Sequence, residues 1–111
     1  MIITLFSGPP GPPGIPHSVE TSTDSITLSW TKPRSDGGSP VTGYVLEKRK
    51  FGDDKWTRAT NVTIPDLTYR VTGLQENNQY EFRVAACNAA GQGAWSNNSD
   101  GIYARMPPCK Y

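Results

Sequence analysis

The sequence predicts an all-β fold, a two-sheet sandwich of about seven short strands. Apolar and polar residues alternate over several stretches, as they do in strands with one buried face. Clusters of Gly, Pro, Asn, Asp and Ser separate these stretches, and no segment has a convincing helical period. The 111 residues are enough for one domain with short tails.

The first two strands are expected before residue 33. One lies near Val19. In the other, Ile26, Leu28 and Trp30 alternate with small polar residues, which predicts a half-buried strand. Proline cannot donate to a strand ladder, so Pro33 ends this second strand.

A third strand is predicted after a loop of turn-forming residues at positions 35–40. Its residues alternate between two faces. Tyr44 and Leu46 lie on one face, and Val45, Glu47 and Arg49 lie on the other.

Four more strands are predicted in the second half of the chain. A turn at residues 51–54 leads to a short strand at 55–60, which contains Trp56, and Tyr69 and Val71 mark the next strand. The longest alternating run consists of Tyr80, Phe82, Val84 and Ala86. Residues 88–98 are expected to be a loop, and the last strand places Ile102 and Ala104 on its inner face.

The charge and hydropathy patterns argue against nucleic acid and membranes as partners. Eleven basic and ten acidic residues give a net charge of +1, too small to attract a polyanion over long range. No apolar stretch approaches the roughly 18–20 residues that span a bilayer.

Cys87 and Cys109 are expected to be reduced thiols, because a disulfide-stapled secreted domain usually has more cysteines. Strand parity places Cys87 on the face opposite Val84 and Ala86. Free thiols suit a reducing compartment. Two glycosylation patterns, at Asn61 and Asn97, point the other way, although a three-residue pattern also recurs by chance.

The predicted domain covers residues 15–105, between an N-terminal tail and Pro/Gly linker at 1–14 and a C-terminal linker at 106–111. Residues 1–7 are interpreted as foreign to the domain or as an unpaired tail, and a strand that pairs with a neighbouring chain is the alternative. The Pro/Gly run favours an extended polyproline II lead-in. A Pro-x-x-Pro ligand for an SH3-like groove is the alternative there, but no Lys or Arg flanks the run.

No set of residues suits catalysis, a cofactor or a metal. The only histidine, His17, lies at the edge of the Pro/Gly run, where a general base would not be held rigidly. Zinc needs about four Cys or His ligands, and His17, Cys87 and Cys109 are too few and too dispersed. We therefore expect a chain with no catalytic activity and no cofactor.

The order and spacing of four segments resemble those of a fibronectin type III domain. The segments are Ser-Ile-Thr-Leu-Ser-Trp at 25–30, Thr-Gly-Tyr-Val-Leu-Glu at 42–47, Leu74 six residues before Tyr80, and Tyr-Glu-Phe-Arg-Val-Ala-Ala-Cys-Asn at 80–88. The resemblance implies a Greek-key sandwich, immunoglobulin-like but without the disulfide. It also implies a tyrosine corner, in which the Tyr80 hydroxyl bonds to backbone near Leu74. The expected core residues are Trp30, Tyr44, Leu46, Leu74, Tyr80, Val84 and Ala86.

Residues 30–44 and the Pro-Pro-Gly-Pro-Pro lead-in are similar to the subgroup found in the giant muscle proteins titin, twitchin and projectin. Cys87 and Ala94-Trp95 depart from that subgroup and leave the parent protein open. The resemblance implies a non-catalytic spacer and docking module in a tandem array, in the cytoplasm of muscle, at the thick filament or A-band of the sarcomere. The implied partners are neighbouring immunoglobulin or fibronectin domains and myosin-associated filament proteins, and the isolated domain is expected to be monomeric. An extracellular adhesion or receptor domain is the alternative, although no Arg-Gly-Asp motif supports it.

A protein-docking surface is predicted on the outer face of one sheet. In this fold the third and sixth strands are neighbours, so Glu47 should face Arg83, or Arg49 should face Glu81. Such pairs are also typical of an ordinary solvated surface. The sharper hypothesis is a docking patch with a partly exposed Trp95 as its anchor. Its residues are Glu47, Arg49, Arg83 and Trp95.

Overall fold

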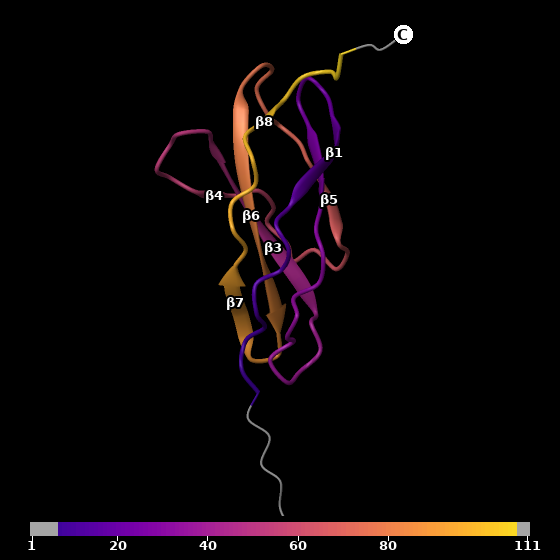
Figure 1. Cartoon of the computed structure of the whole chain (residues 1–111), viewed down its shortest axis with the longest axis vertical. Helices are drawn as coiled ribbons and strands as arrows, with labels where there is room; N and C mark the ends of the chain where they lie inside the picture. The colour runs from indigo at the N-terminus through magenta and orange to yellow at the C-terminus, as the bar shows by residue number, and fades with distance from the viewer. Residues whose placement is uncertain (1–6, 109–111) are drawn as a thin grey trace, which may run out of the picture.

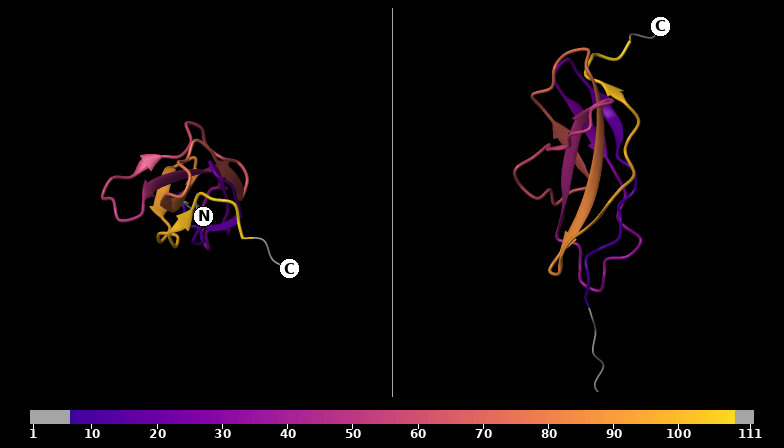
Figure 2. Two further views of the ribbon diagram at one scale, coloured as in Figure 1. Left: turned by 90° about the horizontal axis from the view of Figure 1, so that it is seen from above. Right: turned by 90° about the vertical axis from the view of Figure 1, so that its left-hand side faces the viewer.

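Two β-sheets packed face to face form the molecule in a computed structural model, which describes residues 7–108 (Figures 1 and 2). The first sheet has the order β1-β2-β5. Its strands are β1 (His17–Thr21), β2 (Ile26–Ser29) and β5 (Thr68–Val71). The second sheet has the order β4-β3-β6-β7, and β8 also pairs with β6. Its strands are β3 (Gly43–Lys50), β4 (Thr57–Arg58), β6 (Gln79–Asn88), β7 (Gly91–Trp95) and β8 (Ile102–Tyr103).

The predicted all-β sandwich is confirmed, and the described part of the chain contains no disulfide. The sheets bury their facing apolar side chains because alternate residues of each strand point inward. Every residue predicted for the core is buried, and Ile26, Leu28 and Phe82 are fully enclosed with them. The described chain starts at one pole of the long axis and ends near the opposite pole (Figure 1).

The prediction of a loop at residues 88–98 is wrong, because β7 occupies much of it and pairs with β6. Glycine is a poor strand former, so the Gly-Gln-Gly-Ala segment gives little local signal for a strand. The unpaired edge of the long β6 provides the hydrogen-bonding groups that local propensity lacks. The structure therefore has β7 in addition to the predicted last strand, which corresponds to β8, and both pair with β6.

Two serine hydroxyls continue the pairing of β6 between β7 and β8. Ser96 Oγ accepts a hydrogen bond from the Val84 amide at 3.1 Å, and Ser99 Oγ accepts one from the Phe82 amide at 2.9 Å. Both serines are buried. Buried backbone amides must be paired, so these hydroxyls replace ladder carbonyls where the strand is interrupted.

Residues 8–14, hereafter the strap, lie against the domain, whereas the sequence predicts a linker. The Gly8 amide donates to the Gly37 carbonyl at 2.8 Å, and the Gly14 amide donates to the Thr31 carbonyl at 3.1 Å. Pro10 and Pro13 are buried. The domain boundary at residue 15 stays a prediction, but an SH3-like groove could not reach these two prolines while the strap is seated.

Cys87 is a free, half-buried thiol on β6, and burial raises its pKa, with the positive charge of Arg58 acting in the opposite direction. Cys109 and residues 1–6 lie outside the described residues. We expect two free sulfhydryls in the native protein. A raised pKa leaves less thiolate at a given pH, so Cys87 should react with iodoacetamide more slowly at pH 8 than a free cysteine does.

The reaction rate of Cys87 should rise with pH until the raised pKa is passed, and it is measured cleanly in a Cys109→Ser variant. Because the folded state holds this proton more tightly than the unfolded state, the contribution of Cys87 to stability is full below the unfolded pKa. It is lost as the pH rises through the folded pKa. Thiol titration that finds no free sulfhydryl in the native wild type would contradict the assignment.

Candidate functional site

The outer face of the second sheet gathers charged and aromatic side chains around β3 and β6. The two strands are antiparallel, with Glu47 opposite Arg83 and Arg49 opposite Glu81. Residues two apart on a strand share a face, so these four side chains project together from the sheet. The register thus brings two acidic and two basic groups together in crossed pairs.

Both predicted ion pairs form. Arg83 donates through Nη2 and Nε to Glu47 Oε1, at 2.6 and 3.0 Å. Arg49 Nε donates to Glu81 Oε1 at 2.9 Å. The four side chains are only 11 to 25 % exposed, so solvent screens the pairs incompletely. The charges on this face are therefore largely compensated.

Two tryptophans hold the arginines in place. The Arg83 guanidinium carbon lies 4.4 Å from the ring centre of Trp56 and 4.6 Å from that of Trp95. Arg49 lies 4.5 Å from the ring centre of Trp56. The resulting stack, hereafter the Arg–Trp ladder, consists of Arg49, Trp56, Arg83 and Trp95. Each contact of this type contributes about 0.5–1 kcal/mol at an exposed site.

Part of this outer face is more enclosed than strand parity predicts. Val45, Glu81 and Ala85 are buried, with exposed fractions of 4, 8 and 0 %. Alternation tells only which way a side chain points, whereas the ladder and the neighbouring strands decide how much water reaches it. Trp95 is half-buried, as predicted, and so is Trp56. The four residues of the predicted docking patch are therefore only partly exposed.

Trp56 belongs to the ladder, although the sequence does not predict it as a site residue. It directly precedes β4, which pairs with β3 through Glu47 and Arg58. The tight turn at residues 51–54 was a signal for this position. A chain that reverses there returns beside β3 and places Trp56 next to Arg49.

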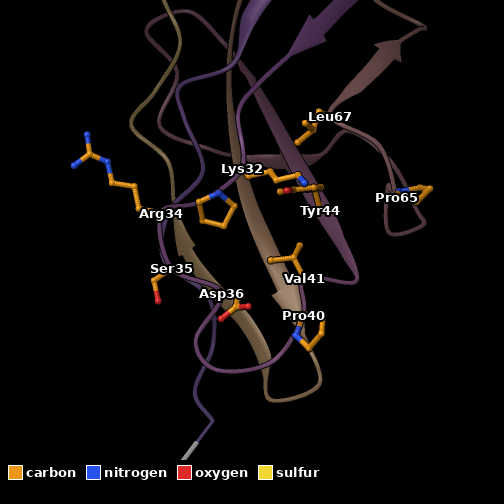
Figure 3. Close-up of a pocket in the computed structure, with 10 residues that line it drawn as sticks. Lys32, Arg34, Ser35, Asp36, Pro40, Val41, Tyr44, Pro65 and Leu67 are labelled. Carbon is orange, nitrogen blue, oxygen red and sulfur yellow. The ribbon is translucent and has the colours of Figure 1, made fainter.

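A shallow pocket of about 770 Å³ lies at the edge of the sandwich and contains mixed charges (Figure 3). Lys32, Arg34, Asp36 and Tyr44 are among the residues that line it, and the Arg34 side chain extends away from the other labelled side chains (Figure 3). Burial raises the pKa of Tyr44, so its hydroxyl keeps its proton near neutral pH. The pocket thus offers hydrogen-bonding groups without a paired nucleophile and base.

The described residues also provide no evident cation site and no membrane span. Within residues 7–108, no three His, Cys, Asp or Glu side chains are grouped so that they could hold a metal ion. The same residues contain no helix that is long and apolar enough to cross a bilayer.

Comparison with known proteins decides the family. Residues 11–102 match the model of the fibronectin type III domain. The chain belongs to the fibronectin type III family. Its tyrosine corner is present, since the Gln75 amide donates to the Tyr80 hydroxyl at 2.9 Å.

The relatives of this fibronectin type III domain include muscle proteins. Titin of Drosophila melanogaster is 38 % identical over 86 residues, which are 78 % of this chain. These residues are so small a part of that titin that their share rounds to 0 %. Fast-type myosin-binding protein C of Gallus gallus is 40 % identical over 74 % of this chain and 7 % of the relative. A titin module from human cardiac muscle is 39 % identical with a TM-score of 0.79, over 88 % of this chain and 95 % of the module. This chain therefore spans only a small part of the curated relatives.

Removing Arg83 should destabilise the domain measurably. Arg83→Ala deletes the pair with Glu47 and both contacts with tryptophan, so we expect it to lower the free energy of unfolding by about 1–2 kcal/mol. Urea denaturation measures this. Arg105→Ala is the matched control, because Arg105 stacks only on Tyr103. An equal midpoint shift in the two variants would show that the ladder adds no more stability than the single stack of Arg105 on Tyr103.

Proposed function

We propose that this fibronectin type III domain is a non-catalytic structural and protein-interaction module of an intracellular giant muscle protein of the titin and twitchin kind. The observation that carries the proposal is the position of the chain ends. The described chain starts at one pole and ends near the other (Figure 1). Neighbouring domains attached at both poles leave the sides of the sandwich free, so the domain acts as a spacer and docking bead in a tandem array.

The family and the outer-face site both support a non-catalytic role for the domain. Fibronectin type III domains are typically non-catalytic. The charged groups of the Arg–Trp ladder are engaged with one another, and an ion-paired carboxylate is poorly placed to act as a general base.

The docking partner that we propose is a myosin-associated filament protein at the thick filament of the sarcomere. The name of one relative, myosin-binding protein C, supports this choice. The physical support is the rigidity of the ladder. Stacking and ion pairs fix Arg83 before any partner arrives, so binding would cost little additional side-chain entropy. Arginine and tryptophan are also the residues enriched at interface hot spots.

Cosedimentation with isolated native thick filaments, which retain their myosin-associated proteins, tests the proposal. We expect the wild type to cosediment and the Trp95→Ala/Arg83→Glu variant to bind about tenfold or more weakly, as expected for a hot spot. The matched control is Tyr103→Ala/Arg105→Glu, which alters the other stacked pair of an arginine and an aromatic ring. This pair lies at the end of β8, outside the ladder. Circular dichroism verifies that each variant is folded. Equal binding of the folded ladder variant and the wild type would contradict the docking patch.

A further inference from the structure

The burial of residues 8–16 repeats every three residues. Pro10, Pro13 and Pro16 are buried, and Gly8, Gly11 and Gly14 are half-buried. The third set, formed by Pro9, Pro12 and Ile15, is exposed. A polyproline II helix has three residues per turn, so this pattern describes such a helix with one fixed edge facing the domain. The strap is thus seated in a definite rotational register.

The glycines of the strap make its hydrogen bonds. Gly8, Gly11 and Gly14 donate in turn to the carbonyls of Gly37, Ser35 and Thr31, at 2.8, 2.9 and 3.1 Å. A polyproline II helix has no internal hydrogen bonds, and proline has no amide hydrogen. Every amide hydrogen within the strap is therefore used by residues 31–37, which run antiparallel to it.

Asn88 and Gly93 form the opposite side of the site. Asn88 is buried, and its Nδ2 donates to the Gly8 carbonyl at 2.8 Å and to the Asp36 carbonyl at 2.7 Å. Its Oδ1 accepts from the Ala90 amide at 2.9 Å, which fixes the amide orientation. A Cβ atom on Gly93 would collide with the Pro10 carbonyl, so glycine is needed there for the strap to approach.

We propose that residues 31–37 together with Asn88 and Gly93 form a binding site for a single polyproline II segment with the repeat Gly-x-Pro, and that the strap is its resident ligand. Each position of the repeat has its own requirement. The first supplies an amide hydrogen, and at Gly14 a Cβ atom would also collide with the Thr31 hydroxyl. The second faces solvent, and the third buries a proline ring. A segment of this kind from outside the domain binds when the strap is withdrawn. The site is separate from the Arg–Trp ladder, and its existence does not depend on the proposed docking function.

The wild-type site is closed to such ligands by its own strap. A covalently attached ligand on a short connection has an effective concentration in the millimolar range. A free peptide that makes the same contacts must exceed that concentration to compete. Binding from outside is therefore visible only after the strap has been displaced.

The experiment displaces the strap in the full chain and supplies it again as a peptide. Pro10→Asp/Pro13→Asp places two charges where proline rings are buried, which should expel the strap while the groove stays intact. The probe is the synthetic peptide Ser-Gly-Pro-Pro-Gly-Pro-Pro-Gly-Ile-Pro, which has the sequence of residues 7–16. We expect saturable amide chemical-shift changes at residues 31–37 and 88–93 of the variant and none in the wild type.

Two further changes test the specificity of the groove. Asn88→Asp, added to the Pro10→Asp/Pro13→Asp variant, keeps the acceptor for the Ala90 amide and removes both side-chain donor hydrogens. It should weaken peptide binding about fivefold or more. Gly93→Ala, added to the same variant, should weaken binding to a similar extent. Gln92→Ala, an exposed neighbour on β7, is the matched control and should leave binding unchanged. A peptide with Pro and Gly interchanged should not bind. Absence of binding to the folded variant would overturn the proposal.

Hydrogen exchange in the wild type provides a second test of the proposal. This test does not depend on whether the Pro10→Asp/Pro13→Asp variant folds. The amides of Gly8, Gly11 and Gly14 should exchange at least tenfold more slowly than that of Ile15 if each opens only when the strap detaches, since about 1.4 kcal/mol corresponds to tenfold. Ile15 has no such hydrogen bond within residues 7–108. Gly93→Ala should abolish this protection, whereas Gln92→Ala should not. Equal exchange of all four amides in the wild type would overturn the proposal.

Discussion

Trp30→Ala is expected to lower the free energy of unfolding by about 3–5 kcal/mol, a large part of the total stability of a small domain. Trp30 is 2 % exposed and lies in the core cluster between the sheets. Its ring meets that of Tyr44 edge-on, with 5.6 Å between the centres and 66° between the planes. Alanine leaves a cavity that surrounding strands cannot close, because their positions are fixed by hydrogen-bonded ladders. Urea unfolding followed by circular dichroism measures the loss.

Trp56→Ala is the matched control for Trp30→Ala. It deletes the same side chain from the half-buried outer face, where the loss is limited to the contacts with Arg49 and Arg83. We expect about 1–2 kcal/mol for this variant. The role of Trp30 as the central core residue is wrong if its replacement leaves the urea midpoint unchanged, or shifts it no more than Trp56→Ala does.

Tyr80→Phe should lower the free energy of unfolding by about 1–3 kcal/mol. The ring of Tyr80 is buried, and its hydroxyl accepts the hydrogen bond from the Gln75 amide. Phenylalanine keeps the ring and removes the acceptor, so the Gln75 amide loses its partner in the turn that precedes β6. Thermal and urea unfolding measure the effect.

Tyr103→Phe is the control for the tyrosine corner, because Tyr103 is 39 % exposed. A surface change of this kind should stay within about 0.5 kcal/mol. Tyr80→Phe should also speed hydrogen exchange of the Gln75 amide, which a general loss of packing would not do selectively. Unchanged exchange of that amide, together with an unchanged midpoint, would contradict the hydrogen bond.

The sequence by itself determined three features, which are the two-sheet fold, the residues of the core and the residues that share the outer face of β3 and β6. Alternation of apolar side chains has a period of two in any strand, so Tyr80, Val84 and Ala86 could be assigned to one face before the partner strands were known. Because the third and sixth strands are neighbours in this fold, the same parity predicts that Glu47 faces Arg83 or that Arg49 faces Glu81. The structure contains both pairs.

The tertiary structure alone decided the segments that have little local pattern. The strap contains no internal hydrogen bonds, and the glycines of β7 disfavour a strand. The docking of the strap on the domain and the strand conformation of β7 follow from distant groups, namely the carbonyls of residues 31–37 and the edge of β6. Trp56 reaches the ladder in the same way, through the pairing of β4 with β3. Side-chain periodicity is carried by neighbouring residues, whereas these contacts join residues far apart in the chain, so only the assembled fold determines them.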